Sequence, residues 1–219
     1  MEFNYIGDGI DAIVIDNFYT EDQLKEIMLE LKWLTKKSIM QPPEKLSSAR
    51  TESGEILTSK KGIFLEQVFA NWQHSALLKY PWDQLHLESV RSKILEFNTL
   101  FKILYQCNSR SHLLSYYENS DYYKAHPDST VFTILNYFHT EPAQFTGGEI
   151  KLYSCNSDRF AKVDVKQNRI VIIAGCTMHE VAPIKSKLEN TLSGNGRYCN
   201  AMFLSVRDEP PKGKKNDSN

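Results

Sequence analysis

Residues 116 to 153 read YYENSDYYKAHPDSTVFTILNYFHTEPAQFTGGEIKLY and contain His126 and Asp128, which stand one residue apart. Side chains at positions i and i+2 of an extended chain point to the same face, so this imidazole and this carboxylate would project together. A third candidate ligand is His179, because it follows the apolar run Ile170 to Ala174, which is typical of a buried strand. Two nitrogen ligands and one oxygen ligand suit ferrous iron and leave coordination positions open.

A second pair with the same spacing, His139 and Glu141, competes for this role. Pro142 follows it directly and places it in a connection between strands. Pro127, between the favoured ligands, cannot donate a ladder hydrogen bond and indicates a strand end or edge. The sequence therefore favours His126, Asp128 and His179 as the metal ligands. The histidines outside the strand region, His74, His86 and His112, have no partner at ligand spacing.

The composition is that of an ordinary soluble globular protein, with 41% apolar and 24% charged residues. The 219 residues suffice for one well-buried domain. A formal net charge of −1 disfavours an electrostatic nucleic-acid binder. No apolar run approaches the roughly 18 residues of a membrane span.

The four cysteines are widely spaced and form no C-x-x-C pair, which argues against a zinc knuckle and a disulfide framework. They are Cys107, Cys155, Cys176 and Cys199. The first residues lack a basic region followed by a long apolar core, so no signal peptide is visible. We therefore expect reduced thiols and a cytoplasmic protein.

The first third of the chain predicts a short strand over residues 11 to 16 and then an amphipathic helix from Thr20. Thr20 and Gln23 have the spacing of a capping box. Residues 36 to 62 are polar and aperiodic, which predicts a long loop with a short hairpin around Gly54. This loop is either a mobile surface loop or a cover over the substrate, with Arg50 and Lys60 as candidate contacts.

An apolar stripe predicts a long helix from about Gln84 to Tyr105. From about residue 111 the period changes, and six short strands are expected, at residues 111–117, 123–128, 131–138, 149–153, 170–174 and 198–206. Helices followed by many short strands imply an α+β fold, in which helices support a two-sheet sandwich or jelly roll. We expect one domain over residues 1–219, with helical support and loop in 1–110, the strand core in 111–206 and a frayed tail in 207–219.

The order of these parts resembles the 2-oxoglutarate- and Fe(II)-dependent oxygenases, in particular their prolyl-4-hydroxylase-like branch. The resemblance rests on His126-Pro127-Asp128, on Gly147-Gly148-Glu149-Ile150, on His179 in His-Glu-Val-x-Pro, and on Gly196-Arg197-Tyr198 opening a last strand. It covers roughly residues 110 to 206. It implies a double-stranded β-helix in the C-terminal half, Fe(II) as the metal and 2-oxoglutarate as cosubstrate, and it allows for ascorbate as an accessory reductant.

The resemblance also assigns residues to the cosubstrate. Arg197 would bind its far carboxylate, since a guanidinium binds a carboxylate bidentately and stays charged when buried. The interval between His179 and Arg197 is longer than in the family, and Lys185 and Lys187 within it are alternative cations. Tyr137 would lie beside the far carboxylate and Tyr116 close to the cosubstrate, and Tyr123 is a third candidate at the same mouth.

The function implied by the resemblance is hydroxylation of a substrate C–H bond, with a prolyl residue of a protein or peptide as the leading substrate. Hydroxylation of a free amino acid or another small molecule on the same site is the alternative, because a fold does not determine its substrate. A non-catalytic, cupin-like metal-binding protein and a purely structural jelly roll are the alternatives from other classes. Neither nucleic acid nor a membrane is expected as a partner, and the oligomeric state stays open.

Overall fold

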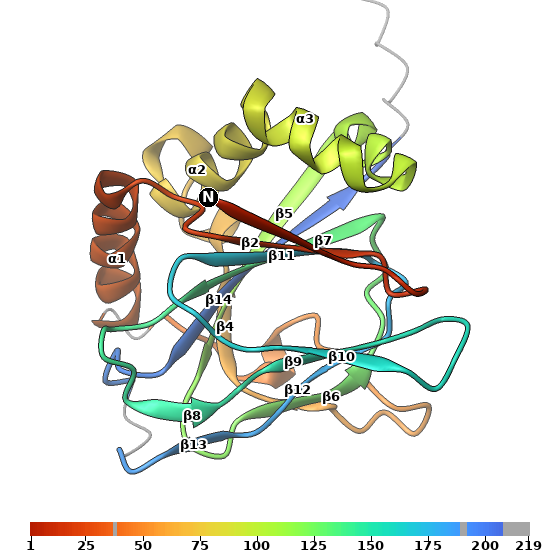
Figure 1. Cartoon of the computed structure of the whole chain (residues 1–219). Coiled ribbons are helices and arrows are strands. Elements are labelled where there is room, and N and C mark those ends of the chain that lie inside the picture. The colour runs from red at the N-terminus through yellow and green to blue at the C-terminus, as the bar shows by residue number, and fades with distance from the viewer. Residues whose placement is uncertain (37–38, 189–191, 208–219) are drawn as a thin grey trace, which may run out of the picture.

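Two antiparallel β-sheets face each other and form the frame of the protein (Figure 1). The computed structural model describes residues 1–36, 39–188 and 192–207. The larger sheet has the order β1 (Glu2–Ile6), β2 (Ala12–Asp16), β11 (Arg169–Ala174), β7 (Phe132–Phe138), β14 (Arg197–Ser205), β5 (Ser109–Tyr117) and β4 (Lys61–Phe64). The smaller sheet has the order β10 (Phe160–Val163), β9 (Ile150–Tyr153), β12 (His179–Val181), β6 (Tyr122–His126) and β3 (Thr58–Ser59). A separate pair joins β13 (Ile184–Ser186) to β8 (Phe145–Gly147).

The strands of the first 64 residues lie at the edges of both sheets. β1 and β2 extend one edge of the larger sheet beyond β11, β4 covers the opposite edge beside β5, and β3 ends the smaller sheet. The strand expected over residues 11 to 16 corresponds to β2, and further N-terminal strands join the core of residues 111–206, because the edges of a sheet need partners and these segments supply them. Each of the six strands expected in that range coincides with an observed strand.

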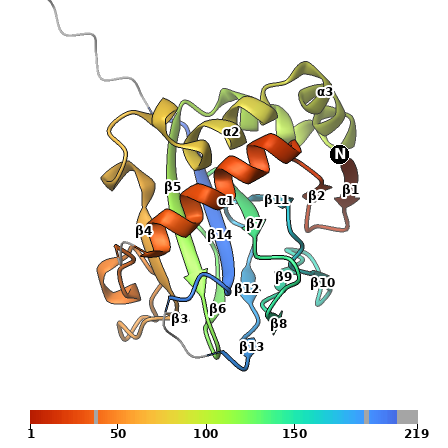
Figure 2. The ribbon, with the colours of Figure 1, turned by 90° about the vertical axis from the view of Figure 1, so that its left-hand side faces the viewer.

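Three helices cover the face of the larger sheet that points away from the smaller one (Figures 1 and 2). They are α1 (Glu21–Lys36), α2 (Ala76–Leu85) and α3 (Glu88–Phe97). The expected capping box is present, because Gln23 N donates to Thr20 Oγ1 and Thr20 N donates to Gln23 Oε1. From α1, Ile27, Leu31 and Leu34 are fully buried against the sheet.

The long helix expected from Gln84 to Tyr105 is broken, which corrects the prediction. α2 ends at Leu85, and Leu87 has an extended backbone with φ −61° and ψ 130° before α3 begins. Leu87, which the apolar stripe placed in the core, is 46% exposed. Beyond α3, Asn98 is extended and its side chain accepts a hydrogen bond from Leu100 N. The remaining helical turns are 3₁₀ helices over Pro43–Lys45, Leu65–Gln67, Trp72–His74, Thr99–Lys102 and Leu104–Gln106.

The polar segment expected as a long loop is more ordered than its composition indicates. Arg50 and Ile56 form a β-bridge around Gly54, as the expected hairpin requires. β3 then pairs with β6, and Gln41 pairs with Gly62. Residues 37 and 38 of this segment lie outside the described residues, as does the expected tail from residue 208 onward.

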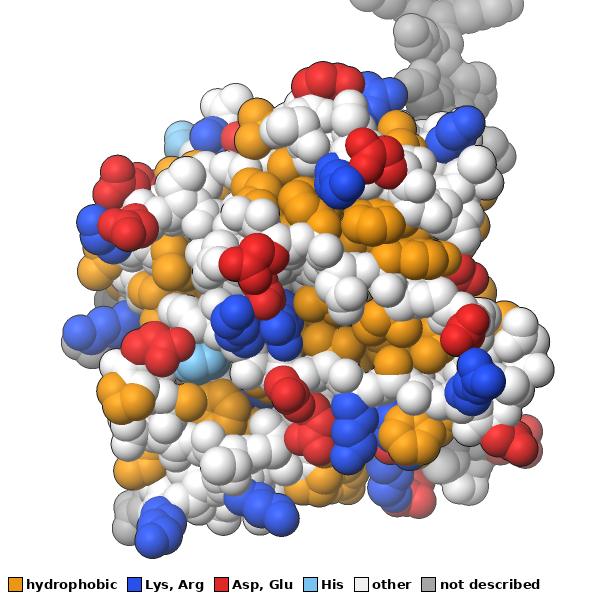
Figure 3. Space-filling model, in the orientation of Figure 1, with side chains coloured by type: hydrophobic (Ala, Val, Ile, Leu, Met, Phe, Trp, Pro, Cys, Tyr) orange, Lys and Arg blue, Asp and Glu red, His pale blue; other side chains and the backbone are white. Residues whose placement is uncertain are grey.

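Alternation along the larger sheet creates two apolar cores. One lies under the helices and contains Tyr116 and Tyr198, while the other lies between the two sheets and contains Tyr117 and Cys199. On the face shown in Figure 3, acidic and basic side chains are interspersed, in keeping with the formal net charge of −1. Within the described residues, no helix combines the length and the apolar character needed to cross a membrane.

Candidate active site

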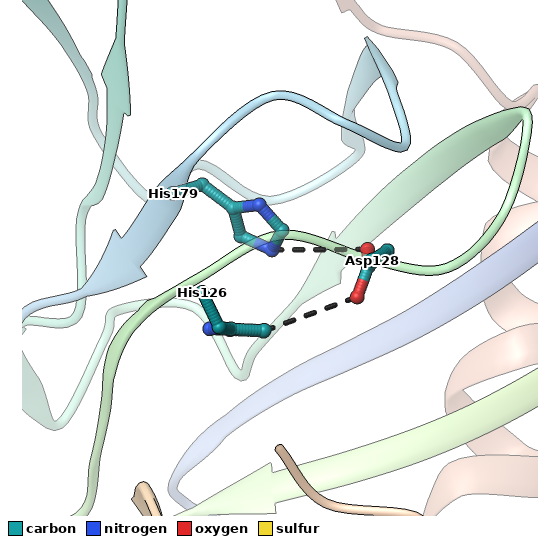
Figure 4. Close-up of side chains that lie close together, drawn as sticks. All are labelled: His126, Asp128 and His179. Atoms are coloured by element: carbon teal, nitrogen blue, oxygen red, sulfur yellow. Dashed lines mark ion pairs between the residues drawn. The ribbon is translucent and has the colours of Figure 1, made fainter. Parts of the chain in front are cut away.

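His126, Asp128 and His179 converge at the mouth of the space between the sheets (Figure 4). His126 ends β6, Asp128 follows two residues later, and His179 begins β12. Nε2 of His126 lies 3.9 Å from Oδ1 of Asp128, and Nε2 of His179 lies 3.8 Å from Oδ2. Among the described residues, this is the one group of three metal-ligating side chains whose ligand atoms all lie within 4.8 Å of one another. Its geometry is suited to holding a single metal ion.

Both histidines are oriented by the backbone two residues before them. Nδ1 of His126 lies 2.8 Å from the Lys124 carbonyl, and Nδ1 of His179 lies 2.8 Å from the Thr177 carbonyl. A carbonyl only accepts, so each Nδ1 carries the hydrogen and each Nε2 keeps its lone pair. The two lone pairs are thereby available where a metal would bind, as is usual for metal-ligating histidines.

Asp128 is held by the strand that follows it. Thr133 Oγ1 donates to Asp128 Oδ2 at 2.6 Å, and Asp128 N donates to the Gly175 carbonyl at 2.8 Å. Thr133 is fully buried. A lone threonine in a strand is too common to signal a function, so this role of Thr133 cannot be predicted from the sequence.

The surroundings favour the neutral form of His126. Burial, and then the neighbouring His179, lowers the pKa of His126 below its ordinary value. Only a neutral imidazole binds a metal, so this shift supports ligation. The ring of Tyr123 stacks on the ring of His126 at 3.6 Å between centroids, which places Tyr123 in the wall of the site.

A cavity of about 440 Å³ extends from the three ligands into the space between the sheets. The larger sheet lines it with Leu113, Leu135, Arg197, Cys199, Ala201 and Phe203, and the smaller sheet with Tyr123, His126, Ile150, His179 and Val181. Its deep end carries Arg197, the first residue of β14.

Arg197 is a buried cation whose guanidinium lacks a full set of partners. It is 1% exposed, and its Cζ lies 4.7 Å from the ring centroids of both Tyr117 and Tyr137. Among the described residues, Nε and Nη1 of Arg197 and the hydroxyl of Tyr137 have no hydrogen-bond partner. Buried polar groups are almost always paired, so these atoms indicate a site for an anionic ligand, and a carboxylate fits a guanidinium bidentately. The structure therefore brings Arg197 and Tyr137 together as expected.

Tyr116 is not brought to this site, which corrects the expectation for it. Its ring lies in the core under the helices, and its hydroxyl accepts hydrogen bonds from Gly194 N and Gly196 N at 3.0 Å each. The adjacent Tyr117 faces the space between the sheets instead, because successive residues of a strand point to opposite faces.

The competing candidates also lie elsewhere. Nδ1 of His139 lies 2.9 Å from the Thr140 carbonyl, and Glu141 is 65% exposed at the surface. Lys185 and Lys187 are exposed. Arg50 is also exposed and donates to the Gly54 carbonyl.

Lys60, in contrast, is buried in the cavity wall. Its Nζ donates to Ser115 Oγ at 3.0 Å. Burial is the largest influence on its pKa, which is lowered to about 8. Of the two candidate contacts named for residues 36 to 62, Lys60 thus lies in the cavity wall, whereas Arg50 lies at the surface.

Gly148 allows the backbone to pass close to Arg197. Its φ is +74°, and an added Cβ would lie 2.3 Å from Ile184 Cδ1 and 2.9 Å from Arg197 Cδ. The neighbouring Gly147, with φ +77°, is equally restricted by the Pro183 carbonyl at 2.3 Å. The pair of glycines is thus required by both backbone conformation and space.

Two histidines and one carboxylate at the mouth of a pocket between two antiparallel sheets are the ligand set and setting of non-haem Fe(II) oxygenases. Residues 111–204 match the family model of the 2OG-Fe(II) oxygenase superfamily. The matched part of the chain carries the three candidate ligands and Arg197, and the predicted resemblance to that superfamily is confirmed. The match implies Fe(II) and 2-oxoglutarate as cofactor and cosubstrate.

Solved structures of prolyl hydroxylases share the fold. A prolyl-4-hydroxylase from Pseudomonas putida is similar with a TM-score of 0.60 and 13% identity over 90% of this chain and 93% of that chain. A prolyl hydroxylase from Trichoplax adhaerens, in complex with a hypoxia inducible factor peptide fragment, is similar with a TM-score of 0.62 and 17% identity over 90% of this chain and 84% of that chain. A comparison with curated protein sequences gives no match.

Proposed function

We propose that this protein is a 2-oxoglutarate- and Fe(II)-dependent dioxygenase that hydroxylates a prolyl residue in a protein or peptide. The observation that carries the proposal is the buried, incompletely paired Arg197 at the far end of a cavity whose mouth holds three metal-ligating side chains. A metal-binding protein without turnover has no need of a buried, unpaired cation at that distance from its metal. A dicarboxylate cosubstrate does, because one carboxylate would bind at the metal and the other at the cation.

Different residues would bind the metal and the cosubstrate. His126, Asp128 and His179 would hold Fe(II), which supplies activation of O2 when bound. Arg197 would bind the far carboxylate of 2-oxoglutarate, and the free hydroxyl of Tyr137 would donate a second hydrogen bond to it. The apolar lining, including Leu135, Ile150 and Val181, would exclude water from the reacting atoms.

The overall reaction balances without a further reactant. 2-Oxoglutarate, O2 and a substrate C–H group give succinate, CO2 and a substrate C–OH group. One oxygen atom of O2 enters the new hydroxyl and the other enters succinate. The 2-oxo acid is the two-electron reductant, so no external reductant is needed for a coupled turnover.

A peptide substrate is supported by two observations. The prolyl hydroxylase from Trichoplax adhaerens that shares the fold was solved in complex with a peptide fragment. The outer part of the cavity is lined by Phe64 and Phe203, which offer apolar surface for a pyrrolidine ring, and by Ser47 and Ser111, which offer hydrogen bonds. We further propose the cytoplasm as the compartment, because all four cysteines are free.

An anaerobic titration tests the site and its cosubstrate together. Metal-free protein is titrated with Fe(II) and then with 2-oxoglutarate, and the visible metal-to-ligand charge-transfer band is followed. The band should form in the wild type, disappear in His179→Ala and require far more 2-oxoglutarate in Arg197→Met. His139→Ala is the matched control, because this buried histidine lies outside the three-ligand group, and it should keep the band.

The substrate is tested separately. Proline-containing peptide libraries are incubated with the iron-loaded enzyme, 2-oxoglutarate and O2, and products are sought by mass spectrometry as a gain of one oxygen on proline. Oxygen gained only by free amino acids in a parallel metabolite screen would contradict the peptide assignment. Failure of the wild type to form the charge-transfer band would refute the dioxygenase itself.

A further inference from the structure

The cavity holds a second enclosed cation besides Arg197. Lys60 comes from the turn between β3 and β4, outside the segment that matches the oxygenase family. It is 6% exposed, and its ammonium forms no ion pair with any carboxylate of the described residues. Its one hydrogen bond among those residues goes to Ser115 Oγ, so an ammonium with three donors has capacity left.

The neighbours of Lys60 hold it in this inward position. Thr58 Oγ1 donates to the Tyr122 carbonyl at 2.8 Å, and Ser59 Oγ donates to Asp121 Oδ1 at 2.6 Å. On the other side, Lys61 points to the opposite face and pairs with Glu118 at 3.0 Å. Because both flanking residues are held in place, the backbone directs the side chain of Lys60 inward, and Lys60 does not behave as a free surface lysine.

The register of the larger sheet places the ammonium between Arg197 and the three ligands. Arg197 pairs with Tyr117, and Cys199 pairs with Ser115, the partner of Lys60. Further along β14, Phe203 pairs with Thr133, which holds Asp128. The step from the pair of Arg197 to the pair of Cys199 is about 7 Å along the strand, which is comparable to the length of a five-carbon dicarboxylate.

The aromatic contacts of the two cations agree with this placement. Nζ of Lys60 lies 4.6 Å from the ring centroid of Tyr123, whose ring stacks on His126, and 5.8 Å from that of Tyr117. Arg197 also contacts Tyr117, at 4.7 Å, and in addition Tyr137, at 4.7 Å. Tyr117 thus lies between the two cations, and Lys60 is the one that contacts the aromatic wall of the metal end.

The charges of the lining require an anion at both places. Among the described residues that line the cavity, Asp128 is the one carboxylate, whereas Lys60, Arg197 and Arg207 are cationic. A divalent metal would add to this excess. Enclosed like charges are costly unless an anion joins them, so a dianion is the ligand that fits.

We infer that Lys60 is a second carboxylate-binding residue of the cavity, which holds the carboxylate next to the keto group of 2-oxoglutarate while Arg197 holds the far one. This inference rests on the proposed function, since it assigns the two ends of the same cosubstrate. It makes the N-terminal β3–β4 segment a part of the cosubstrate site.

The test uses Zn(II)-loaded full-length protein, which cannot turn over, and calorimetric titration with two 2-oxo acids. 2-Oxoglutarate has both carboxylates, and 2-oxobutyrate lacks the far one. Lys60→Met should weaken the binding of both acids to a similar extent, by about 10- to 100-fold. Arg197→Met should weaken 2-oxoglutarate by a comparable factor and leave 2-oxobutyrate unchanged. Lys60→Arg should recover part of the lost affinity.

Controls keep the outcomes distinct. Lys61→Met removes a neighbouring charge on the opposite face and should leave both affinities unchanged. Zinc stoichiometry and thermal unfolding of Lys60→Met establish that the variant is folded and metal-loaded. Unchanged affinities in Lys60→Met overturn the inference while the proposed function stands, and a loss confined to 2-oxoglutarate overturns it too, because Lys60 would then serve the far carboxylate. If wild-type protein binds neither acid, the proposed function fails and this inference falls with it.

Discussion

His126 and His179 are direct register partners on the antiparallel strands β6 and β12, and their ring centroids lie 4.4 Å apart. Two of the three candidate ligands are thus positioned by the hydrogen-bond ladder of a sheet, which is stiffer than a loop. Asp128 lies just beyond the strand end and depends on side-chain support from β7.

Thr133→Val should weaken metal binding by about 10- to 100-fold, because it removes the hydroxyl that orients Asp128 while keeping the volume of the side chain. A competition titration with a chromogenic zinc chelator measures the affinity. Thr140→Val is the control, since its buried hydroxyl lies outside the site and has no partner among the described residues. Equal affinities for Thr133→Val and the wild type would show that Asp128 needs no such support.

Tyr137→Phe should raise the Kd for 2-oxoglutarate by roughly tenfold and change the free energy of unfolding by less than about 0.5 kcal/mol. The reason is that the Tyr137 hydroxyl has no partner among the described residues and is free for a ligand. Tyr19→Phe should do the reverse, because the buried Tyr19 hydroxyl donates to Asn136 Oδ1 away from the site. Its loss should cost about 1 to 2 kcal/mol of stability and leave the Kd unchanged. Chemical denaturation and calorimetry give both quantities, and a stability loss in Tyr137→Phe would mean that its hydroxyl is already paired.

Gly148→Ala should lower the free energy of unfolding by about 1 to 3 kcal/mol and weaken 2-oxoglutarate binding. The positive φ of +74° is unfavourable for alanine, and the new methyl group would collide with Ile184 and push on Arg197. Gly54→Ala isolates the backbone effect, because its φ is +87° but nothing lies within 4 Å of an added Cβ. That control should be destabilised less and should bind 2-oxoglutarate normally. If both variants bind it equally well, Gly148 does not position Arg197.

Asp16→Asn should lower stability at pH 7 by about 2 kcal/mol, and the difference from the wild type should shrink as the pH falls from about 4 to about 2. Hydrogen bonds from Arg169, the largest influence, and then from Lys166 lower the pKa of Asp16 to about 2. A carboxylate with a depressed pKa in the folded state stabilises it fully above its unfolded pKa and loses that effect as it protonates. Urea denaturation at several pH values measures this. Asp22→Asn is the control, because this carboxylate is 90% exposed at a helix start, and it should change the stability at pH 7 by less than about 0.5 kcal/mol.

The sequence predicted most of the site because the chemistry of its residues is local. A single residue separates His126 from Asp128, and the strand before His179 is continuous and apolar. Tyr116 was misplaced because the last six residues of β5 are all buried, so no polar alternation shows which face belongs to which core. The break at Leu87 was missed because neither glycine nor proline interrupts the apolar stripe there.

The sequence offered Lys60 as a candidate substrate contact but not as an enclosed cation. Its neighbours are polar, and nothing local indicates that β3 and β4 would be drawn to the edges of two different sheets. The enclosure of its ammonium results from the pairing of β3 with β6 and of β4 with β5. In the sequence, α2 and α3 separate β3 and β4 from these two partner strands. Only the assembled sheets reveal it.

The position of β14 bears on how the chain matures during synthesis. β14 lies between β7 and β5 near the middle of the larger sheet, yet among the strands of the described residues it is the last to be synthesised. Asp16 likewise cannot pair with Arg169 until 153 further residues have been synthesised, which takes roughly 8 to 30 s at ordinary translation rates. A nascent chain that stops before residue 197 lacks both the strand that joins the two halves of the sheet and the cation of the cavity. Premature termination should therefore yield unfolded chains for proteolysis and not partly active enzyme.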